Sequence, residues 1–351
     1  MKKIKIKFCG YNHNDKYSYG YYIINILKKY YKVELSEDPD YVFYNESAYE
    51  HLKYDCIKIF YTGENLHPNF NLCDYAISFD YMEFGDRHYR LPIYLVANFY
   101  RDQEIEQVGN EDFTKQLSIT DEDLNKKTGF CSFVYSNYLG DNTRKIFFEK
   151  LGEYKKVDSG GAYLNNIGGK VSNKLEFEMS HKFSIAFENS SRSGYTTEKL
   201  TTALLARTIP IYWGNPDIGK EFNDERFINC HKYKNFDEVI ARVKEIDNNN
   251  ELYLQIINKP VTVGYDFALV RKDFEDFLRK IFDQPLEQAR RICINPVRAL
   301  ELKNNEILIA KSISKRSIIR KFFAIIYKPF KKIQTFEKMK QRYFSSKILN
   351  K

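Results

Sequence analysis

The sequence predicts an α/β protein made of two sheet-containing halves followed by a basic helical tail. Three observations predict this class. Short aromatic and β-branched runs recur between polar connections, the chain of 351 residues is longer than one ordinary domain, and the residues from Lys311 onward differ in composition from the rest. Hydrophobic residues make up 43% and aromatic residues 16%, a globular composition that excludes an intrinsically disordered chain.

The first half, residues 1–125, begins with strand periodicity, because Ile4, Ile6 and Phe8 alternate with lysines and Gly10 follows as a turn residue. Further apolar runs are separated by polar or helical connections, a rhythm typical of a parallel sheet with crossover helices. The pattern predicts a helix over residues 18–31 and strands over residues 41–44, 57–61 and 75–79.

The second half is assigned to residues 126–300, after a polar, acid-rich connector over residues 101–127. It is predicted to be α/β as well. A strand is expected over residues 129–135, HKFSIAFENS (181–190) is expected to run from a strand into a loop, and TIPIYWGNP (208–216) from a strand into a turn. The expected helices cover residues 142–151 and 196–207. Two such halves predict a cleft between them, where the carboxyl ends of parallel strands hold ligands.

The tail, residues 301–351, carries the positive charge of the chain. From Lys311 to Lys351 there are 13 Lys or Arg and one acid, Glu337, whereas the remainder has 42 basic and 46 acidic residues. Apolar residues recur there at helical spacing, so a basic amphipathic helix pair over residues 312–351 is predicted to bind an anionic membrane surface. The alternative is a helix packed on the body. The acidic body argues against a nucleic-acid partner.

Several classes of site and location are disfavoured. The six cysteines show no CxxC pair, and no apolar run reaches signal-peptide or membrane-spanning length, so we expect a cytoplasmic protein at the inner membrane face. The sequence has no HExxH, P-loop or GxGxxG, which argues against a zinc hydrolase, a kinase and a dehydrogenase. Asp38 and Asp40 form a DPD that could hold a metal, but a loop leading into a strand is the favoured interpretation.

The strongest pattern is FSIAFENSSRSGYTTEKLTTALLARTIPIYWGNP, residues 183–216. A buried strand leads to Glu188 and Asn189, and Thr197, Glu198 and Lys199 fall where a helix begins. A helix start offers unpaired backbone donors and a positive dipole end, to which Lys199 adds a full charge. The pattern therefore predicts a site for the diphosphate of a nucleotide sugar.

The motifs AFENS, YTTEKL and IPIYWGNP, together with residues 60–94 (FYTGENLHPNFNLCDYAISFDYMEFGDRHYRLPIY), resemble the α-1,3/4-fucosyltransferases that use GDP-fucose, in their bacterial form. The resemblance covers about residues 1–300. It implies a GT-B fold, in which two Rossmann-like domains face each other across a cleft. The first domain would bind mainly the acceptor and the second would bind GDP-fucose.

The same resemblance implies a role for each matching residue. Glu64 falls on the general base, which an inverting transfer needs because the acceptor hydroxyl must lose a proton as it attacks. Arg144 and Lys199 fall on the cations that meet the donor phosphates. The remaining matches are to groups around the donor: Glu198, which contacts the fucose, and Asn189 and Tyr195. With two fixed cations a metal is not obligatory, although a divalent ion is not excluded as a stimulant.

The expected reaction is transfer of L-fucose from GDP-fucose to a hydroxyl of an N-acetylglucosamine-containing, N-acetyllactosamine-like glycan, in α-1,3 linkage. Two alternatives stay open. One is the same fold with a different nucleotide-sugar donor, and the other is a catalytically silent glycan-binding protein associated with a membrane.

Overall fold

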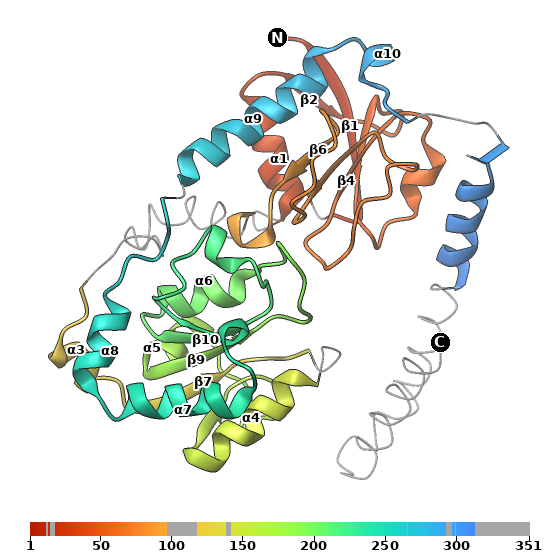
Figure 1. Cartoon of the computed structure of the whole chain (residues 1–351). Coiled ribbons are helices and arrows are strands. Elements are labelled where there is room, and N and C mark those ends of the chain that lie inside the picture. The colour runs from red at the N-terminus through yellow and green to blue at the C-terminus, as the bar shows by residue number, and fades with distance from the viewer. Residues whose placement is uncertain are drawn as a thin grey trace. The chain divides into compact units, whose positions relative to one another are not determined.

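The computed structural model describes residues 1–11, 13–14, 18–96, 118–137, 142–264, 266–292, 297–298 and 300–312. The chain divides into two compact units, Met1–Ile292 and Cys293–Lys351. The first unit contains two lobes, each built on its own parallel sheet (Figure 1). The α/β class and the GT-B-like pairing of sheets predicted from the sequence are therefore present.

The sheet of the first lobe has the strand order β2-β1-β3-β4-β5-β6 among the described residues, and every pairing is parallel. Neighbouring strands place aromatic and aliphatic side chains opposite each other, such as Phe43 and Ile59. Both residues are fully buried, so the sheet forms the centre of this lobe. The strands are β1 (Lys3–Cys9), β2 (Lys32–Leu35), β3 (Tyr41–Tyr44), β4 (Ile57–Tyr61), β5 (Tyr75–Ser78) and β6 (His88–Arg90).

The sheet of the second lobe has the order β11-β10-β9-β7-β8, again with parallel pairs. Its central strand β9 (His181–Phe187) reads HKFSIAF and is buried along almost its whole length, as expected for a parallel strand covered on both faces. The other strands are β7 (Gly129–Phe133), β8 (Val157–Ser159), β10 (Ile209–Trp213) and β11 (Ile228–Asn229).

Several of the helices begin at residues whose side chains cap them. Ser18 accepts a hydrogen bond from the Tyr21 amide, and Thr197 accepts one from the Lys199 amide. The α-helices are α1 (Tyr19–Lys28), α3 (Asp121–Asn125), α4 (Thr143–Tyr154), α5 (Lys174–Met179), α6 (Glu198–Leu205), α7 (Phe236–Asp247), α8 (Asn250–Ile257), α9 (Phe267–Asp283) and α10 (Leu286–Ala289). The 3-10 helices are η1 (Glu50–Lys53), η2 (Ile218–Lys220) and η3 (Cys230–Lys232). Helix α3 lies inside the predicted connector, where Thr120 and Asp123 form a capping box.

Helix α9 follows the second lobe in sequence but packs on the first (Figure 1). Phe274 stacks on Tyr22 of α1 at 6.1 Å between ring centroids, and Phe282 packs on Tyr41 of β3 at 4.4 Å. Glu275 accepts hydrogen bonds from Lys29 and Tyr30. The residues after the second sheet thus return to the core of the first lobe, although the sequence grouped them with residues 126–300.

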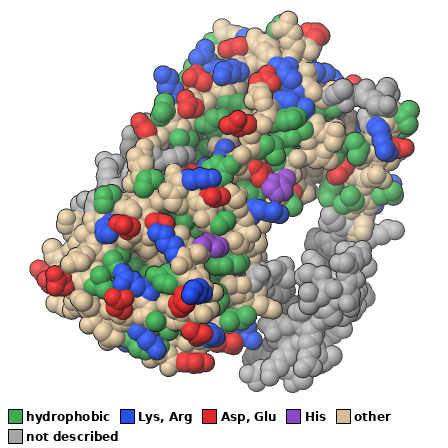
Figure 2. Space-filling view, viewed as in Figure 1, with side chains coloured by type: hydrophobic (Ala, Val, Ile, Leu, Met, Phe, Trp, Pro, Cys, Tyr) green, Lys and Arg blue, Asp and Glu red, His purple; other side chains and the backbone are tan. Residues whose placement is uncertain are grey.

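In the second unit, residues 300–312 are helical. The rest of the predicted basic amphipathic tail, residues 313–351, lies outside the described residues. Within the part of the chain that the structure describes, no helix has both the length and the apolarity needed to cross a bilayer. On the face of the molecule in Figure 2, acidic and basic side chains are interspersed.

Candidate functional site at the carboxyl ends of the two sheets

Three neighbouring strands of the first lobe, β3, β4 and β5, end at the same edge of their sheet. The residues just beyond these ends are Glu46, the segment Thr62–Glu64, and Asp80. The strands are parallel, so their carboxyl ends open together and bring these polar side chains to one place. Glu64 therefore lies where an α/β sheet holds ligands.

The loop that carries Glu64 is fixed at three points. The buried Thr62 hydroxyl accepts a hydrogen bond from the Glu64 amide at 3.0 Å. Asn65 donates from Nδ2 to Oγ of Ser190 in the second lobe at 2.6 Å. Farther along, Nδ1 of His67 lies 2.6 Å from Oδ1 of the buried Asp80. The Glu64 carboxylate itself is exposed, so a rigid backbone presents an accessible side chain.

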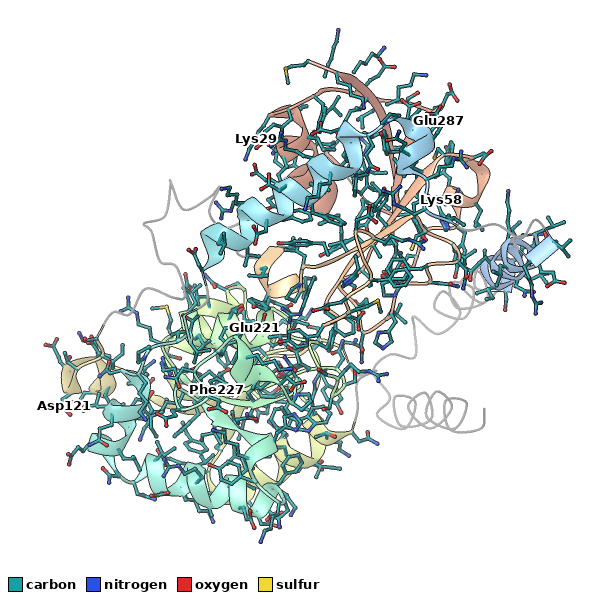
Figure 3. The ribbon with its side chains drawn as sticks, turned by 45° about the horizontal axis from the view of Figure 1, so that its top comes forward. Lys29, Lys58, Asp121, Glu221, Phe227 and Glu287 are labelled. Carbon is teal, nitrogen blue, oxygen red and sulfur yellow. The ribbon has the colours of Figure 1, made fainter. Side chains whose placement is uncertain are left out.

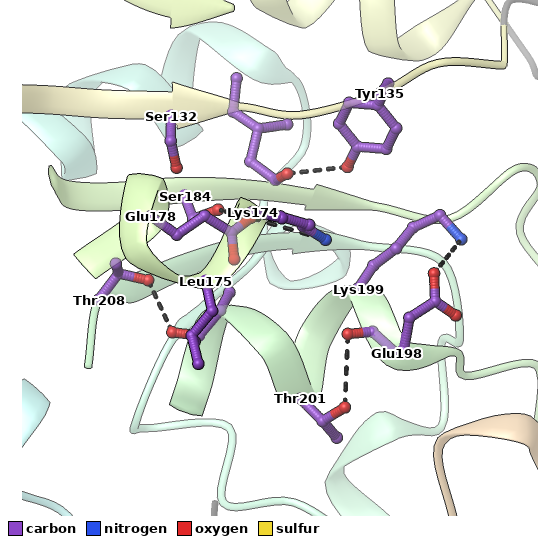
Figure 4. A network of polar contacts seen from close by, with 12 residues as sticks. Ser132, Tyr135, Lys174, Leu175, Glu178, Ser184, Glu198, Lys199, Thr201 and Thr208 are labelled. Atoms are coloured by element: carbon purple, nitrogen blue, oxygen red, sulfur yellow. Dashed lines mark hydrogen bonds and ion pairs between the residues drawn. The ribbon is translucent and has the colours of Figure 1, made fainter. Parts of the chain in front are cut away.

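In the second lobe, Glu188 organises the start of α6. Its fully buried carboxylate accepts hydrogen bonds from the amide and the hydroxyl of Thr197, both at 2.7 Å. Lys199 Nζ lies 3.2 Å from the same carboxylate and donates to the Thr197 hydroxyl at 2.9 Å. It also lies 3.7 Å from Glu198 (Figure 4). Glu188 is thus a structural carboxylate that holds both the cap and the lysine.

These contacts correct one expectation about α6. The sequence predicted unpaired backbone donors at the helix start, to which Lys199 adds a full charge, whereas the Thr197 N–H is already bonded to Glu188 and the lysine has anionic neighbours. The physical reason is burial. Only 15% of the Lys199 side chain is exposed, and a charge this far from water requires partners. A diphosphate that meets Lys199 must therefore share or replace these partners, of which Glu198 is the most distant.

Arg144 is the second residue of α4, and its guanidinium is almost fully buried. Nε donates to the Phe187 carbonyl at 3.2 Å and Nη2 donates to Oδ1 of Asn189 at 2.5 Å. The guanidinium also lies over the Tyr135 ring, 4.4 Å from its centroid. Arg144 thereby positions the end of β9 and orients Asn189. Within the described residues, two of its five N–H groups make these bonds.

Tyr195 lies where the lobes meet. Its ring is buried and packs edge-on against Phe79 of the first lobe, with the centroids 5.2 Å apart. The neighbouring Gly194 adopts a positive φ of 80°, and a Cβ there would lie 2.6 Å from the Phe79 carbonyl oxygen. Only glycine allows the two backbones to approach this closely. The packing of Tyr195 against Phe79 of the first lobe therefore fixes its position beside the candidate site.

A buried ion pair joins the lobes beside this contact. Arg90 of β6 lies 2.5 Å from Glu221, which follows η2 in the second lobe (Figure 3). Tyr94 also donates to Glu221 at 2.8 Å, and Arg90 donates to the carbonyl oxygens of Phe79 and Gly194. The Glu221 side chain is 3% exposed, so the pair is shielded from water and its partners compensate its charges.

The two candidate catalytic carboxylates differ in electrostatic environment. Partial burial raises the pKa of Glu64, the negative charges of Glu46 and Glu198 add to this effect, and Lys199 opposes it. Desolvation also acts on Glu198, but the positive charges of Lys199 and Lys174 outweigh it and lower the pKa of that carboxyl. One group is thus tuned toward accepting a proton and the other toward remaining ionised.

No cluster of three or more His, Cys, Asp or Glu side chains suited to a metal occurs in the described ranges. The DPD residues have structural partners instead. Asp40 accepts from the Lys5 amide, and Asp38 pairs with the Lys5 ammonium at 3.3 Å. A separate hollow of about 630 Å³ lies between β6 and α9, lined by residues such as Tyr89 and Phe277, and it does not include Glu64 or Lys199.

Comparison with known proteins agrees with this geometry. Residues 6–97 match the Alpha-(1,3)-fucosyltransferase FucT N-terminal domain, and residues 124–258 match the glycosyltransferase family 10 (fucosyltransferase) C-terminal region. A crystal structure of an α1,3-fucosyltransferase with GDP-fucose is 30% identical and superposes with a TM-score of 0.64, covering 82% of this chain and 93% of that one. This chain belongs to the family 10 fucosyltransferases.

Other relatives of this fucosyltransferase cover less of its sequence or of their own. The Helicobacter pylori Alpha-(1,3)-fucosyltransferase FucT is 37% identical over 260 residues, which are 66% of this chain and 54% of that protein. The human 4-galactosyl-N-acetylglucosaminide 3-alpha-L-fucosyltransferase 9 is 30% identical over 135 residues, 38% of this chain and 37% of that protein. The chain therefore spans about half the length of the bacterial protein.

The fold of this fucosyltransferase brings its six predicted site residues to the facing edges of two sheets. The start of α6 carries Glu198 and Lys199, and the end of β9 lies beside Asn189 and Arg144. Tyr195 packs against the first lobe, and the charges of Glu198 and Lys199 act on the pKa of Glu64. Sequence reasoning missed Glu46, Asn65, Ser190 and the Arg90–Glu221 pair. Asn65 and Ser190 adjoin predicted site residues, which is the one signal that pointed to them.

Proposed function

We propose that this protein is an inverting glycosyltransferase that transfers L-fucose from GDP-fucose to a glycan hydroxyl, forming an α-1,3 linkage. One observation carries the proposal. The loop of Glu64 in the first lobe is hydrogen-bonded to the second lobe through Asn65 and Ser190, and the charges of Glu198 and Lys199 at the start of α6 act on the Glu64 carboxylate. The structural neighbour solved with GDP-fucose has the same overall arrangement, which supports the choice of donor.

The proposed reaction uses these groups in one displacement. The oxygen of the acceptor hydroxyl bonds to the anomeric carbon of fucose while Glu64 accepts the proton of that hydroxyl. The bond from that carbon to the GDP oxygen breaks, and GDP leaves with the bonding electrons. Lys199, Arg144 and the start of α6 stabilise the charge on the departing diphosphate. Glu198 stabilises positive charge on the fucose ring, and Asn189 and Tyr195 contact the donor.

The proposed acceptor is an N-acetyllactosamine-like glycan, carried in the cell on a lipid or a larger glycan. The support is the resemblance of the first-lobe motif and the name of the human relative, which describes action on a 4-galactosyl-N-acetylglucosaminide. The loops beyond β3, β4 and β5 supply the surface for such an acceptor, since they surround Glu64.

The test is a donor and acceptor panel with the full chain. GDP-fucose, GDP-mannose, UDP-galactose and UDP-N-acetylglucosamine are each offered with N-acetyllactosamine, and nucleoside diphosphate release is followed. We expect GDP release from GDP-fucose alone, product linkage α-1,3 by NMR, and retained activity in EDTA. Turnover with a UDP-sugar instead would establish the alternative donor. Binding of the glycan without turnover of any donor would establish a silent glycan-binding protein.

We also propose that residues 312–351 hold the enzyme at the cytoplasmic face of a membrane rich in anionic lipids. The support is the sequence, with 13 basic residues and one acid from Lys311 onward and apolar residues at helical spacing. The full chain should sediment with vesicles containing phosphatidylglycerol and not with pure phosphatidylcholine vesicles. A chain ending at residue 311 should stay in the supernatant and keep its activity. Equal sedimentation of both chains would contradict the proposal.

A further inference from the structure

Glu46 occupies a place beside the candidate base that the proposed reaction does not explain. It lies two residues beyond the end of β3, and β3 pairs in parallel with β4, the strand that leads to Glu64. Its loop is well fixed. Asn45 donates from Nδ2 to the Gly10 carbonyl at 2.9 Å and accepts from the Ser47 amide at 3.0 Å. A half-buried carboxylate is thus held at the edge of the site.

The buried Thr62 hydroxyl connects Glu46 to Glu64. Thr62 Oγ1 donates its proton to Oε2 of Glu46 at 3.0 Å and accepts the Glu64 N–H at 3.0 Å. A hydroxyl has one proton, so its donation to Glu46 leaves a lone pair directed at the Glu64 amide. Oε2 of Glu46 accepts this hydrogen bond, which sets the orientation of the Thr62 hydroxyl. Glu46 therefore fixes the backbone from which Glu64 projects.

The charge of Glu46 acts on the same group. Within the described residues, the charges that act on Glu64 are those of Glu46 from the loop after β3, and of Glu198 and Lys199 from α6. After partial burial, Glu46 is the strongest cause of the raised pKa of Glu64. A nearby negative charge makes a carboxylate a better proton acceptor, because the protonated form loses the repulsion.

We propose that Glu46 is a positioning residue for Glu64, holding the backbone of the base through the Thr62 hydroxyl and placing a second carboxylate next to it. The inference rests on the proposed function, in which Glu64 is the base. Nothing in it requires Glu46 to touch the substrate.

The test separates charge from hydrogen bonding with three variants of the full chain. Glu46→Gln keeps an oxygen that can accept from Thr62 but removes the charge. Thr62→Val removes the hydroxyl but keeps the charge, and Thr62→Ser restores the hydroxyl. Glu50→Gln is the matched control, since Glu50 follows in the same segment and pairs with Lys7 and Lys53. The readouts are the pH profile of kcat/KM and the NMR titration of the Glu64 side chain, assigned with Glu64→Gln.

For Glu46→Gln we expect the acidic limb of the kcat/KM profile to shift to lower pH by about half a pH unit to one pH unit, and the NMR titration of Glu64 to shift with it. This is the size of effect that one neighbouring charge has in a partly hydrated site. Thr62→Val should lower kcat about tenfold with little change in the KM for GDP-fucose. Thr62→Ser should restore most of that loss, and Glu50→Gln should resemble the wild type.

An unchanged Glu64 titration in Glu46→Gln would overturn the proposal, as would a Thr62→Val enzyme with full kcat. If the wild-type chain released no GDP from GDP-fucose, the proposed function would fail on its own. The NMR titration would still decide whether Glu46 acts on Glu64, because it needs no turnover.

Discussion

Asn65 Nδ2 of the first lobe donates a 2.6 Å hydrogen bond to Oγ of Ser190 in the second lobe. Asn65 follows Glu64, and Ser190 follows Asn189. One hydrogen bond thus joins the loop of the candidate base to the end of the strand that carries the donor site.

A double-mutant cycle should detect the Asn65–Ser190 bond. Asn65→Ala and Ser190→Ala should each reduce kcat/KM, and the double variant should lose less than the sum of the two effects. A coupling of about 0.5–1.5 kcal/mol is expected for one hydrogen bond. The measurement is kcat/KM for GDP-fucose at a fixed acceptor concentration. Strict additivity would mean that the bond does not form in the working enzyme.

Glu64→Gln should lower kcat by about a hundredfold to ten-thousandfold, the usual contribution of a general base. GDP affinity, measured by calorimetry, should stay close to the wild-type value, because the residues proposed to bind the diphosphate lie in the other lobe. Glu83→Gln is the matched control, since Glu83 is an exposed carboxylate of the first lobe. Full activity of Glu64→Gln would show that another group takes the proton.

The pH dependence should follow the raised pKa of Glu64. The ionised form is the base, so kcat/KM should fall as the pH drops through a pKa above the ordinary 4.5. The raised pKa of Glu64 also affects the stability of the folded chain, which changes with pH in the opposite direction to the activity. Ionising Glu64 is less favourable in the folded chain, so its contribution to stability is complete below pH 4.5 and is lost as the pH rises through the folded pKa. Glu64→Gln should therefore unfold at the same temperature or higher at neutral pH, measured by calorimetry.

Lys199→Ala should weaken GDP binding by about tenfold to a hundredfold, as expected when a charge-assisted contact to phosphate is removed. It should also reduce the unfolding temperature, because Glu188 loses a cation in a site without water access. Lys150→Ala is the control: that lysine pairs with Asp237 on the surface of the same lobe. Unchanged GDP affinity in Lys199→Ala would remove the lysine from the donor site.

Arg90→Met should destabilise the folded chain by about 3 kcal/mol or more, since it leaves the buried Glu221 carboxylate without its cation. The matched control is Arg242→Met, which breaks an exposed pair with Glu245 and should cost less than about 1 kcal/mol. Urea unfolding at neutral pH measures both. An equal decrease in the free energy of unfolding in the two variants would show that the buried Arg90–Glu221 pair contributes no more to stability than an exposed ion pair.

Local patterns in the sequence predicted much of the fold. The strand at residues 41–44 and the strand at residues 57–61 are β3 and β4 as the structure has them, and the expected helix at residues 142–151 is α4, one residue later at its start. The TTEKL pattern gave the start of α6, with Thr197 as its cap. Each signal is an apolar period or a capping residue within a few positions, which is why sequence reasoning reached it.

The return of α9 to the first lobe was beyond such reasoning. Its apolar face needs a partner surface, and both sheets offered one. Only the packing of Phe274 and Phe282 against Tyr22 and Tyr41 selects the first. The burial of Arg144 has the same origin, because the end of β9 and the Tyr135 ring enclose its guanidinium.

By itself the sequence determined two α/β halves and the residue types of a donor site, because hydrophobic period, helix caps and motif spacing are properties of short segments. The tertiary structure alone decided that the residue after Glu64 bonds Ser190, 125 positions away, and that Lys199 is held by Glu188. Contacts at such separation depend on how two sheets pack and on which charges burial forces together. No local pattern encodes either.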